Sequence, residues 1–388
     1  MPNNPTTALV KTVQSPALAR VSNQLALTDK LLTKPEEPFL IPYRKGNKWG
    51  FCDRNKNIVI DCVYGEVRFP NEMYISWHEG YFVHNKKGNV IWQYKHWEDE
   101  AFITNGLAAV EDWNKWGFID ETGKAVTPIK YDYVSEFYEG LALVKFDNKS
   151  AFLNEKGEEI LTFTNSQYND VEPFSNGLSR VGLNEKYGFI NKNRHEVIPL
   201  IYDNAGCCDH VVSFSEGMAS VEIDDRWGFI NLKGEQITPC VYERAEQFSD
   251  GMALVSRRLY CLKQVFIDLK GEEVIDLSKY DWAKSFSNEL ALVVKGSKFG
   301  YINKRGYEVI PLSFDYEGPW VKHVGNFYED LAAVTLNGRW GYINRSGKEV
   351  TSIKYKYCQP FRRGLGFVTL DNYANGYIDT SGIEYWDD

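Results

Sequence analysis

Short apolar runs separated by tight-turn residues recur along nearly the whole chain, and residues 106–137 show the pattern most clearly. Residues 107–110, LAAV, and residues 116–119, WGFI, are rich in β-branched, aromatic and small apolar side chains, which is typical of strands. Trp113, Asn114 and Lys115 lie between the two runs and predict a turn. The pattern therefore predicts a β-hairpin as the start of a repeated unit.

A second turn and a third strand follow the hairpin. Residues 120–123, DETG, place an acid first and a glycine fourth, as in a type I turn that closes with a residue in the left-handed region. Residues 124–127 predict the third strand, which ends at Pro128 because proline has no amide donor for a ladder. A less regular connection then leads from Tyr131 to Phe137. Each unit is therefore expected to supply about three strands.

The unit recurs in ten copies with a mean period of about 36 residues. We centre the copies on the aromatic residue of the second strand, namely Phe51, Phe82, Phe118, Phe152, Phe189, Phe229, Phe266, Tyr301, Tyr342 and Tyr377. A second marker, Phe-x-x-Gly-Leu/Met-Ala/Ser-x-Val, runs out of step with the first and starts at Phe102, Phe137, Phe174, Phe214, Phe248, Phe286, Phe327 and Phe361. The copy at Phe102 has one extra residue before the glycine, and two copies carry Glu289 and Asp330 in its place. Such a period indicates a repeat protein, in which one unit cannot bury its apolar face without its neighbours.

The motifs within one unit are specific enough to suggest a family. They are Lys-Trp-Gly-Phe-Ile-Asp from Lys115, Pro-x-x-Tyr-Asp from Pro128 and the Phe-x-x-Gly marker from Phe137. In these motifs the chain resembles the WG repeat family of bacterial proteins, over roughly residues 40–386. The Trp-Gly pair itself occurs at Trp49, Trp116, Trp227 and Trp340 and is replaced in the other copies. The resemblance implies little about function, because repeats of this kind are mostly uncharacterised and carry no known catalytic residues.

The acid or amide that opens each third-strand turn has a structural explanation. Two turns, at Asp53 and Asn191, lack the glycine and carry Lys56 and Arg194 in its place. In the first of them we expect Asn57 to supply the positive φ, because asparagine tolerates it. One acid per turn falls far short of the six to eight oxygen ligands that calcium takes, so a row of calcium sites is not predicted.

Two arrangements of the units compete. An open β-solenoid or superhelical array adds three-stranded units without limit, whereas a closed β-propeller-like ring needs a fixed number of blades, typically about 4–8. Ten units exceed that range, and the period is shorter than the ~40–45 residues of a WD-type blade. We therefore predict an all-β repeat protein stacked as an open array, with the closed ring as the alternative.

The N-terminal residues differ from the repeats. Ser15-Pro16 resembles a helix start, and Leu18, Val21 and Leu25 fall on one face of the helix that would follow. We divide the chain into residues 1–36, a flexible segment with a short amphipathic helix, and residues 37–388, the repeat array. The helix would either cap the first repeat or dock a protein partner through the same apolar stripe.

Candidate binding residues lie where the repeat departs from its pattern. The second copy carries Trp77, Trp92 and Trp97, and an insertion at residues 316–325 carries Trp320 and His323. Aromatic residues are enriched in interface hot spots, and insertions in repeat proteins map to loops that often bind. The alternative is that the tryptophans fill a core from which the usual residues have been lost.

Composition narrows the classes of function. The net charge of −9 argues against broad binding of a nucleic-acid backbone, which needs clustered lysine and arginine. No apolar run approaches the ~18 residues of a membrane span. The N-terminus has no signal-peptide core, and the seven cysteines follow no repeat position, so we expect a cytoplasmic protein. Cys207-Cys208-x-His210 does not match the spacing of a zinc site, and we predict no metal and no cofactor.

No catalytic constellation is evident in the sequence. The chain has no Gly-x-Ser-x-Gly elbow, no phosphate-binding Gly-Lys-Ser/Thr loop and no His-Glu-x-x-His motif. We therefore expect a non-catalytic protein-interaction scaffold, an adaptor or recognition subunit of a bacterial complex such as a defence or effector system. Protein partners would bind the N-terminal helix or the array surface. A carbohydrate or cell-wall ligand-binding module, in which repeated tryptophans stack on sugar rings, is the alternative.

Overall fold

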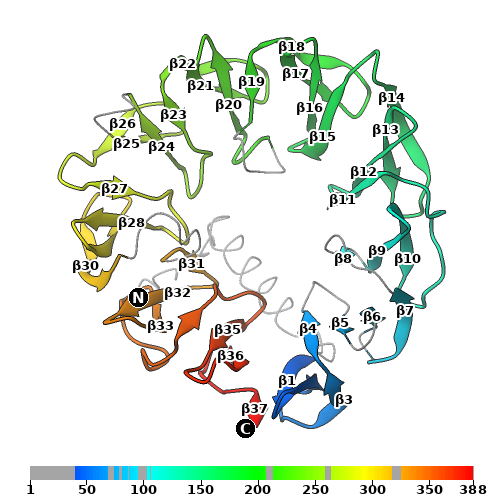
Figure 1. Ribbon diagram of the computed structural model, residues 1–388. Coiled ribbons are helices and arrows are strands. Elements are labelled where there is room, and N and C mark those ends of the chain that lie inside the picture. Colours follow the sequence, from blue (N-terminus) through cyan, green and yellow to red (C-terminus); the bar gives the residue numbers. More distant parts are fainter. Residues whose placement is uncertain are drawn as a thin grey trace, which may run out of the picture. The chain divides into compact units, whose positions relative to one another are not determined.

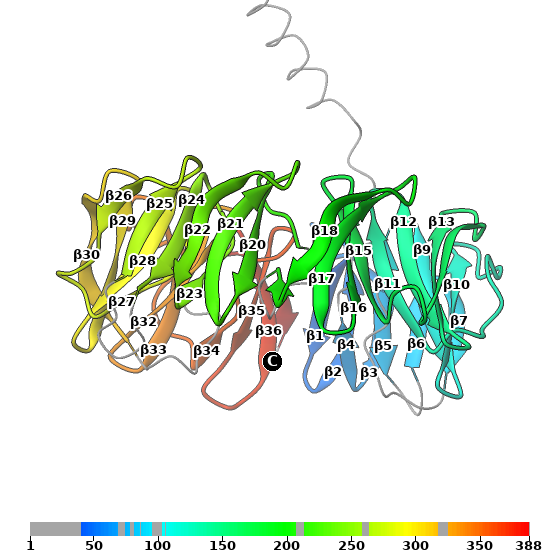
Figure 2. The ribbon, with the colours of Figure 1, turned by 90° about the horizontal axis from the view of Figure 1, so that it is seen from above.

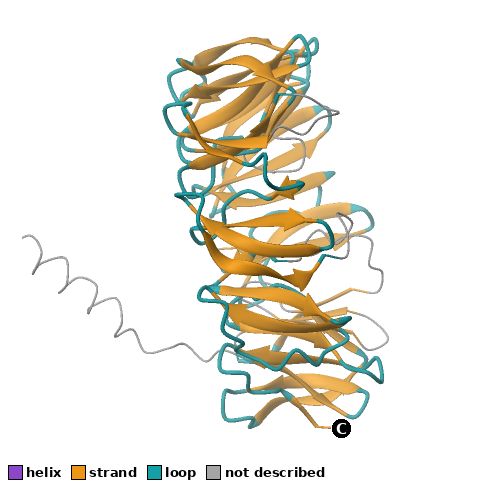
Figure 3. Ribbon diagram, turned by 90° about the vertical axis from the view of Figure 1, so that its left-hand side faces the viewer, coloured by secondary structure: helices purple, strands orange, loops and turns teal. Residues whose placement is uncertain are grey.

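The computed structural model describes residues 40–68, 74–77, 81–85, 87–94, 103–104, 106–206, 213–257, 264–316 and 325–387. Residues 40–388 form one compact unit. All regular elements of the described residues are β-strands, joined by short turns (Figure 3). The helix predicted after Ser15 lies outside the described residues.

The strands have the following bounds. They are, in chain order, β1 (Ile41–Lys45), β2 (Lys48–Cys52), β3 (Ile58–Tyr64), β4 (Glu66–Arg68), β5 (Tyr74–Trp77), β6 (Tyr81–His84), β7 (Val90–Tyr94), β8 (Ile103–Thr104), β9 (Leu107–Asp112), β10 (Lys115–Asp120), β11 (Tyr133–Tyr138), β12 (Leu141–Phe146), β13 (Lys149–Asn154), β14 (Glu159–Thr164), β15 (Asp170–Ser175), β16 (Leu178–Leu183), β17 (Lys186–Asn191), β18 (Glu196–Tyr202) and β19 (Asn204–Ala205). The second half continues with β20 (Met218–Ile223), β21 (Arg226–Asn231), β22 (Gln236–Tyr242), β23 (Arg244–Ala245), β24 (Met252–Ser256), β25 (Gln264–Asp268), β26 (Glu273–Asp276), β27 (Trp282–Ala283), β28 (Leu290–Lys295), β29 (Lys298–Asn303), β30 (Glu308–Asp315), β31 (Phe327–Tyr328), β32 (Leu331–Leu336), β33 (Arg339–Asn344), β34 (Tyr357–Cys358), β35 (Leu365–Thr369), β36 (Asn375–Asp379) and β37 (Trp386–Asp387).

These strands form ten small sheets of three or four strands, which follow one another around a ring (Figure 1). Within the β15–β18 sheet, β15 lies nearest the centre of the ring and β18 lies at its periphery. Figure 2 shows the ring edge-on, with the strands crossing its thickness. The prediction of an all-β repeat protein is confirmed.

Each sheet contains a strand that the sequence pattern did not mark. The connection from Tyr131 to Phe137 forms β11, in which Val134 pairs with Val144 and Phe137 with Ala142. This strand is innermost in its sheet and joins the next three strands of the chain. A register shift between Val134 and Phe137 interrupts the alternation of apolar residues, which is why the sequence pattern did not reveal this strand. With it, most sheets have four strands and not the expected three.

The last strand of the chain closes the ring. β37 pairs with β1 in parallel, with Arg44 opposite Trp386. The amide of Gly46 also donates to the carbonyl oxygen of Asp387 at 2.9 Å. The ring of Trp49 stands edge-on to that of Tyr377 at 5.9 Å. The pairing selects the closed ring of the two arrangements and corrects the preference for an open array. The physical reason is that the extra strand satisfies the free edge of β1, which an open array leaves unpaired.

The sheets are joined by pairs of aromatic rings. Phe152, from the third strand of one sheet, packs against Phe174, from the innermost strand of the next, with ring centroids 4.6 Å apart. The same contact recurs in seven successive interfaces: Phe118–Phe137, Phe152–Phe174, Phe189–Phe214, Phe229–Phe248, Phe266–Phe286, Tyr301–Phe327 and Tyr342–Phe361. The two markers found in the sequence are therefore the two halves of one contact between sheets.

The glycine of the Trp-Gly pair makes room for the outermost strand. A Cβ on Gly228 would lie 2.7 Å from the carbonyl oxygen of Thr238, and the register of β21 with β22 shifts at this point. Sheets without the glycine show no such shift there, because Ala151 pairs with Thr162 and Val265 with Asp276 in continuous register. The glycine thus accompanies a bulge in the neighbouring strand.

The turn that follows the third strand of each sheet, the one with the central aromatic position, is built alike in all copies. In the turn at Asp120, Oδ1 accepts the amides of Thr122 and Lys124 at 2.9 and 3.0 Å. After the Asp120 turn, residues 124–127 form no strand, so the third strand predicted there is wrong, and Ala125 makes only an isolated bridge to Ile119. Lys56 and Arg194, which replace the glycine, adopt φ values of 63° and 64° themselves. The expectation that Asn57 supplies the positive φ is therefore wrong, because the turn fixes the position and not the residue type.

The same turn corrects the register of the second copy. Asn85 Oδ1 accepts the amides of Lys87 and Asn89, both at 3.0 Å, so Asn85 opens the turn. The residue equivalent to Phe152, two places before the turn, is then Val83, which is fully buried. Centring this copy on Phe82 was wrong by one residue, because the aromatic side chain occupies the place of the glycine.

Acidic residues of the inner hairpin turns join neighbouring sheets. Glu139 accepts the amide of Gly177 at 3.0 Å, and Glu216 accepts that of Gly251 at 2.8 Å. Asp250 does the same with Glu289 at 2.6 Å. These side chains are exposed or half-buried, and their place beside the Phe-x-x-Gly marker is explained by this contact with the next turn.

We predict that Gly228→Ala lowers the free energy of unfolding by about 2–3 kcal/mol, because the added Cβ meets backbone atoms that cannot move without breaking the β21–β22 ladder. Chemical denaturation would measure the loss. The matched control is Ala151→Gly at the equivalent position of the β11–β14 sheet, for which we expect about 1 kcal/mol from added backbone freedom. Equal effects of the two variants would contradict the explanation.

A second prediction concerns two equivalent tyrosines. Tyr342 donates its hydroxyl to the carbonyl oxygen of Gln359 at 2.5 Å, whereas the buried hydroxyl of Tyr301 has no partner among the described residues. Tyr342→Phe should therefore cost about 1 kcal/mol of stability, while Tyr301→Phe should cost nothing or stabilise the fold. Thermal denaturation of the two variants distinguishes them, and a larger loss for Tyr301→Phe would refute the prediction.

Candidate functional site

Two positions on the innermost strands vary in chemistry from sheet to sheet while the surrounding framework stays constant. The first position pairs with the end of the next strand and is occupied by Tyr133, Asp170, Asn204, Arg244, Trp282 and Tyr357. The second, two residues later, is occupied by Ser135, Glu172, Gly206, Glu246, Lys284 and Gln359. We use the name inner-strand arc for these two positions in the sheets from β11 to β28, together with the side chains that contact them.

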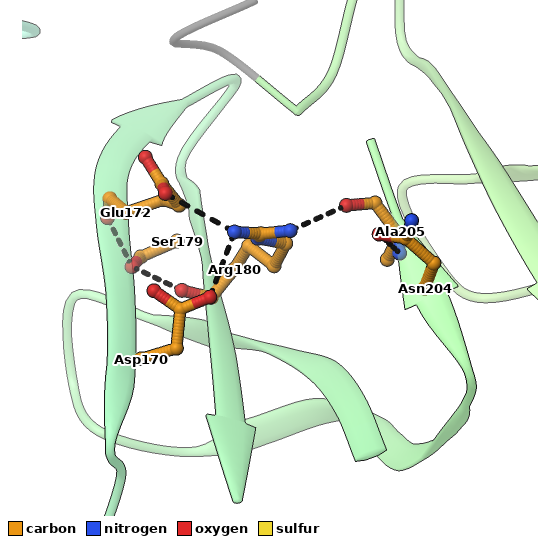
Figure 4. A network of polar contacts seen from close by, with 6 residues as sticks. All are labelled: Asp170, Glu172, Ser179, Arg180, Asn204 and Ala205. Atoms are coloured by element: carbon orange, nitrogen blue, oxygen red, sulfur yellow. Dashed lines mark hydrogen bonds and ion pairs between the residues drawn. The ribbon is translucent and has the colours of Figure 1, made fainter. Parts of the chain in front are cut away.

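Arg180 is the centre of the first polar cluster in the arc (Figure 4). Its Nη2 donates to Asp170 Oδ2 at 2.8 Å and to Glu172 Oε1 at 3.1 Å. Its Nη1 donates to the carbonyl oxygen of Ala205 on the next sheet at 3.0 Å. The guanidinium group also lies over the ring of Tyr187, 4.9 Å from its centroid. One side chain from β16 therefore holds two carboxylates and bridges two sheets.

The carboxyl group of Glu172 is poorly solvated despite this partner. Burial raises its pKa, the nearby Asp170 raises it further, and Arg180 and Lys145 oppose the shift. Lys145 comes from the preceding sheet, where its Nζ lies 5.5 Å from the ring centroid of Tyr133. The charges of two successive sheets thus act on one another along the inner strands.

A second cluster lies around Glu246 and Lys284. Ser285 Oγ donates to Glu246 Oε2 at 2.5 Å, and Arg244 lies 3.3 Å from the same carboxylate. Burial lowers the pKa of Lys284 to about 8, and Glu246 opposes the shift. The amine of Lys284 also lies 5.9 Å from the ring of Trp282. This lysine therefore holds its proton less tightly than an exposed lysine does.

Each cluster includes or contacts a residue that lies, in the chain, next to a segment outside the described residues. One segment contains Cys207, Cys208 and His210, and the other lies within the insertion at residues 316–325. Ala205, which accepts from Arg180, comes shortly before residues 207–212. Tyr316, whose ring lies 6.0 Å from that of Trp282, comes directly before residues 317–324.

The candidate binding residues fall largely outside the described part of the chain. These are Trp97, Trp320 and His323, together with Leu18, Val21 and Leu25 of the predicted helix. Trp77 ends β5, where its backbone pairs with Tyr81. Trp92 is half-buried and packs against a cluster that contains Val83 and Val110. A binding role for these residues stays a prediction.

The arc was missed by sequence reasoning because its partners are far apart in the chain. Arg180 and Ala205 are 25 residues apart, and Ser285 and Glu246 are 39 apart. A signal was present, since Arg180 stands in β16 where the equivalent strands carry uncharged residues, as at Leu143. A charge within an otherwise apolar strand marks a partner, although it does not identify that partner.

The described residues contain no group of three His, Cys, Asp or Glu side chains placed to bind one metal ion. Residues 207–212, with their two cysteines and histidine, lie outside this set. Among the described residues there is also no helix with the length and apolar character needed to cross a membrane.

The repeat pattern matches a known family. The model of the WG containing repeat matches residues 49–75, 116–149, 152–187, 187–227, 227–257, 266–299, 299–340 and 340–373, which is more than half of the chain. The chain belongs to the WG-repeat family. The matches leave out β6 and its Val83-centred copy, where the Trp-Gly pair is lost.

Solved structures show distant likeness to the WG-repeat ring. A eukaryotic initiation factor has 9% identity and a TM-score of 0.49, with 89% of this chain and 95% of that chain covered. BamB from Moraxella catarrhalis has 10% identity and a TM-score of 0.37, with 80% and 95% covered. Kluyveromyces lactis Hsv2p has 9% identity and a TM-score of 0.35, with 64% and 93% covered. No curated protein sequence matches this chain.

The arc leads to a prediction about pH. As the pH falls, the unfolded chain protonates Lys284 near 10.5, whereas the folded WG-repeat ring does so only near 8. Burial of this amine therefore costs stability below pH 8, and the cost disappears as the pH rises toward 10.5. Relative to wild type, Lys284→Met should gain about 1–3 kcal/mol at pH 7, with the gain shrinking above pH 8.

Thermal denaturation across this pH range measures the effect. The matched control is Lys270→Met on an exposed turn, which removes the same charge from the surface. A stability difference for Lys284→Met that is constant with pH would contradict the lowered pKa.

Proposed function

We propose that the WG-repeat ring is a non-catalytic protein-interaction scaffold, acting as an adaptor or recognition subunit of a bacterial complex, and that its partner binds the inner-strand arc. The observation that carries the proposal is the contrast between positions. Residues that join the sheets are nearly constant from copy to copy, whereas the two inner-strand positions hold acids, bases, amides and aromatics. The fold does not require different residue types at these two positions, and binding of a ligand would account for the differences.

The chemistry of the arc favours a protein partner. Acidic and basic groups alternate along it, from Lys145 through Glu172 and Arg180 to Glu246 and Lys284. Such a surface matches a polypeptide that presents both charges, because complementary charge fixes the register of a partner. The half-buried pair Trp282 and Tyr316 adds the aromatic surface that interface hot spots favour.

The carbohydrate alternative has a narrower basis. Three of the four tryptophans of the Trp-Gly pairs are buried, with exposures of 9% at Trp49, 8% at Trp116 and 4% at Trp340, whereas Trp227 is half-buried. The three buried rings offer no stacking face to a sugar. Within the described residues, this reading depends on rings outside those buried positions, such as Trp113, which is 89% exposed, and the half-buried Trp282 and Tyr316. Cytoplasmic location belongs to the proposal as well and has its support in the sequence alone.

Peptide display against the purified full chain would test the proposal. We expect selection of peptides that carry both acidic and basic residues, and we expect Glu246→Lys to weaken their binding about tenfold or more by placing a third base beside Arg244 and Lys284. The matched control is Glu196→Lys on the outermost strand β18, which makes the same charge change on the opposite edge of a sheet and should leave binding unchanged.

Two outcomes would count against a protein-binding arc. One is equal weakening of the selected peptides by Glu246→Lys and Glu196→Lys, which would indicate an effect of net charge alone. The other is selection of oligosaccharides on a glycan array with no selection of peptides, which would favour the carbohydrate alternative.

A further inference from the structure

Among the described residues, the outermost strand of each four-stranded sheet has one edge without a partner strand. One position at the centre of that edge differs between sheets. In β14 it is Thr162, which follows Leu161, the residue that pairs with the buried Phe152. The position holds Asp61, Gln93, Thr162, Pro199, Pro239, Asp276 and Pro311 in β3, β7, β14, β18, β22, β26 and β30. Proline removes the amide donor, and aspartate places a charge on the edge, so both discourage pairing with another strand.

β14 has neither form of protection at this position. Its sequence, EILTFT, keeps continuous register with β13 over four residue pairs, from Leu161 opposite Phe152 to Thr164 opposite Lys149. The register shifts only beyond Phe152, next to the turn. The edge is therefore straight over the residues where proline-bearing strands are bulged. β7 also lacks proline, but residues 95–100 that follow it lie outside the described part.

The direction of the backbone groups follows from one hydrogen bond. The amide of Asn165 donates to the carbonyl oxygen of Asn148 at 3.2 Å, which marks these residues as a hydrogen-bonded pair of the antiparallel ladder. Such pairs alternate along a ladder, so Phe163 and Leu161 also bond toward β13. The amide and carbonyl groups of Ile160, Thr162 and Thr164 therefore point to the free edge.

The outward groups allow β14 to pair with itself. In an antiparallel pair of two copies related by a two-fold axis at Thr162, Thr162 faces Thr162, Ile160 faces Thr164, and Leu161 faces Phe163. These are β-branched, polar-to-polar and apolar pairs of the kind that stabilise sheets. Glu159 would face Asn165, so no like charges meet. The same arrangement on β3 would place Asp61 against Asp61.

We propose that β14 is a self-association site, at which two copies of this chain join the β11–β14 sheets edge to edge into one eight-stranded antiparallel sheet. The occupant is a second copy because the strand is complementary to its own sequence in the register that its outward backbone groups require. One strand pair buries little surface, so the dimer is weak and depends on concentration.

Sedimentation velocity of the full chain over a wide range of concentration tests the proposal. We expect the wild-type mass to rise from one chain to two. Thr162→Pro should remain a single chain throughout, because it removes the central outward donor without removing a bond to β13. The matched control is Thr162→Val, which keeps the amide and the β-branched shape and should still dimerise.

A second variant guards against loss of fold. Thr162→Asp copies the residue that β3 and β26 carry at this position, and it should also abolish the dimer by placing two carboxylates face to face. Circular dichroism at each concentration would verify that the variants are folded. A wild-type chain that stays single at all concentrations, or a dimer that survives both Thr162→Pro and Thr162→Asp, would overturn the proposal. Neither result bears on the inner-strand arc, which lies at the other edge of the sheets.

Discussion

The structure depends on the aromatic pair that joins each sheet to the next. One ring comes from the third strand of a sheet and the other from the end of the following innermost strand, as in Phe152 and Phe174, 4.6 Å apart. Such a pair adds about 0.5–1.5 kcal/mol to the free energy gained by burying the rings. Because no sheet contains both members, a single sheet leaves a large ring exposed. The sheets are therefore stable only together, and the repeat must continue until its ends meet.

Ring closure follows from the same need of each sheet for a neighbour. An array of sheets has two exposed ends, and each end presents an aromatic position without its partner. β37 satisfies the free edge of β1, and Tyr377 contacts Trp49 across the junction. The closed ring removes both ends at once, which explains how ten sheets form one compact unit among the described residues. The outer edges remain, and proline or aspartate occupies most of their central positions.

These constraints leave few positions free to carry function. The faces of the sheets are committed to packing against their neighbours, and the turns are committed to holding their own amides or those of the next sheet. The remaining freedom lies at the inner strands and at the outer edges. The inner-strand arc and the edge of β14 are the places where the chain departs from its repeat, and they differ in kind. The arc presents charged and aromatic side chains, whereas β14 presents backbone groups.

The sequence by itself determined the repeat, the strand-forming runs, the turn at each Asp or Asn and the aromatic character of the sheet contacts. These features depend on hydrogen bonds and periodicities within a few residues, so they are visible along the chain. Only the tertiary structure decided that the array closes, that Gly228 faces a bulged strand, and that Arg180 bridges to Ala205. Closure depends on the rotation accumulated from sheet to sheet, and Arg180 meets its partners across an interface. No local pattern records either quantity, because residues far apart in sequence set both.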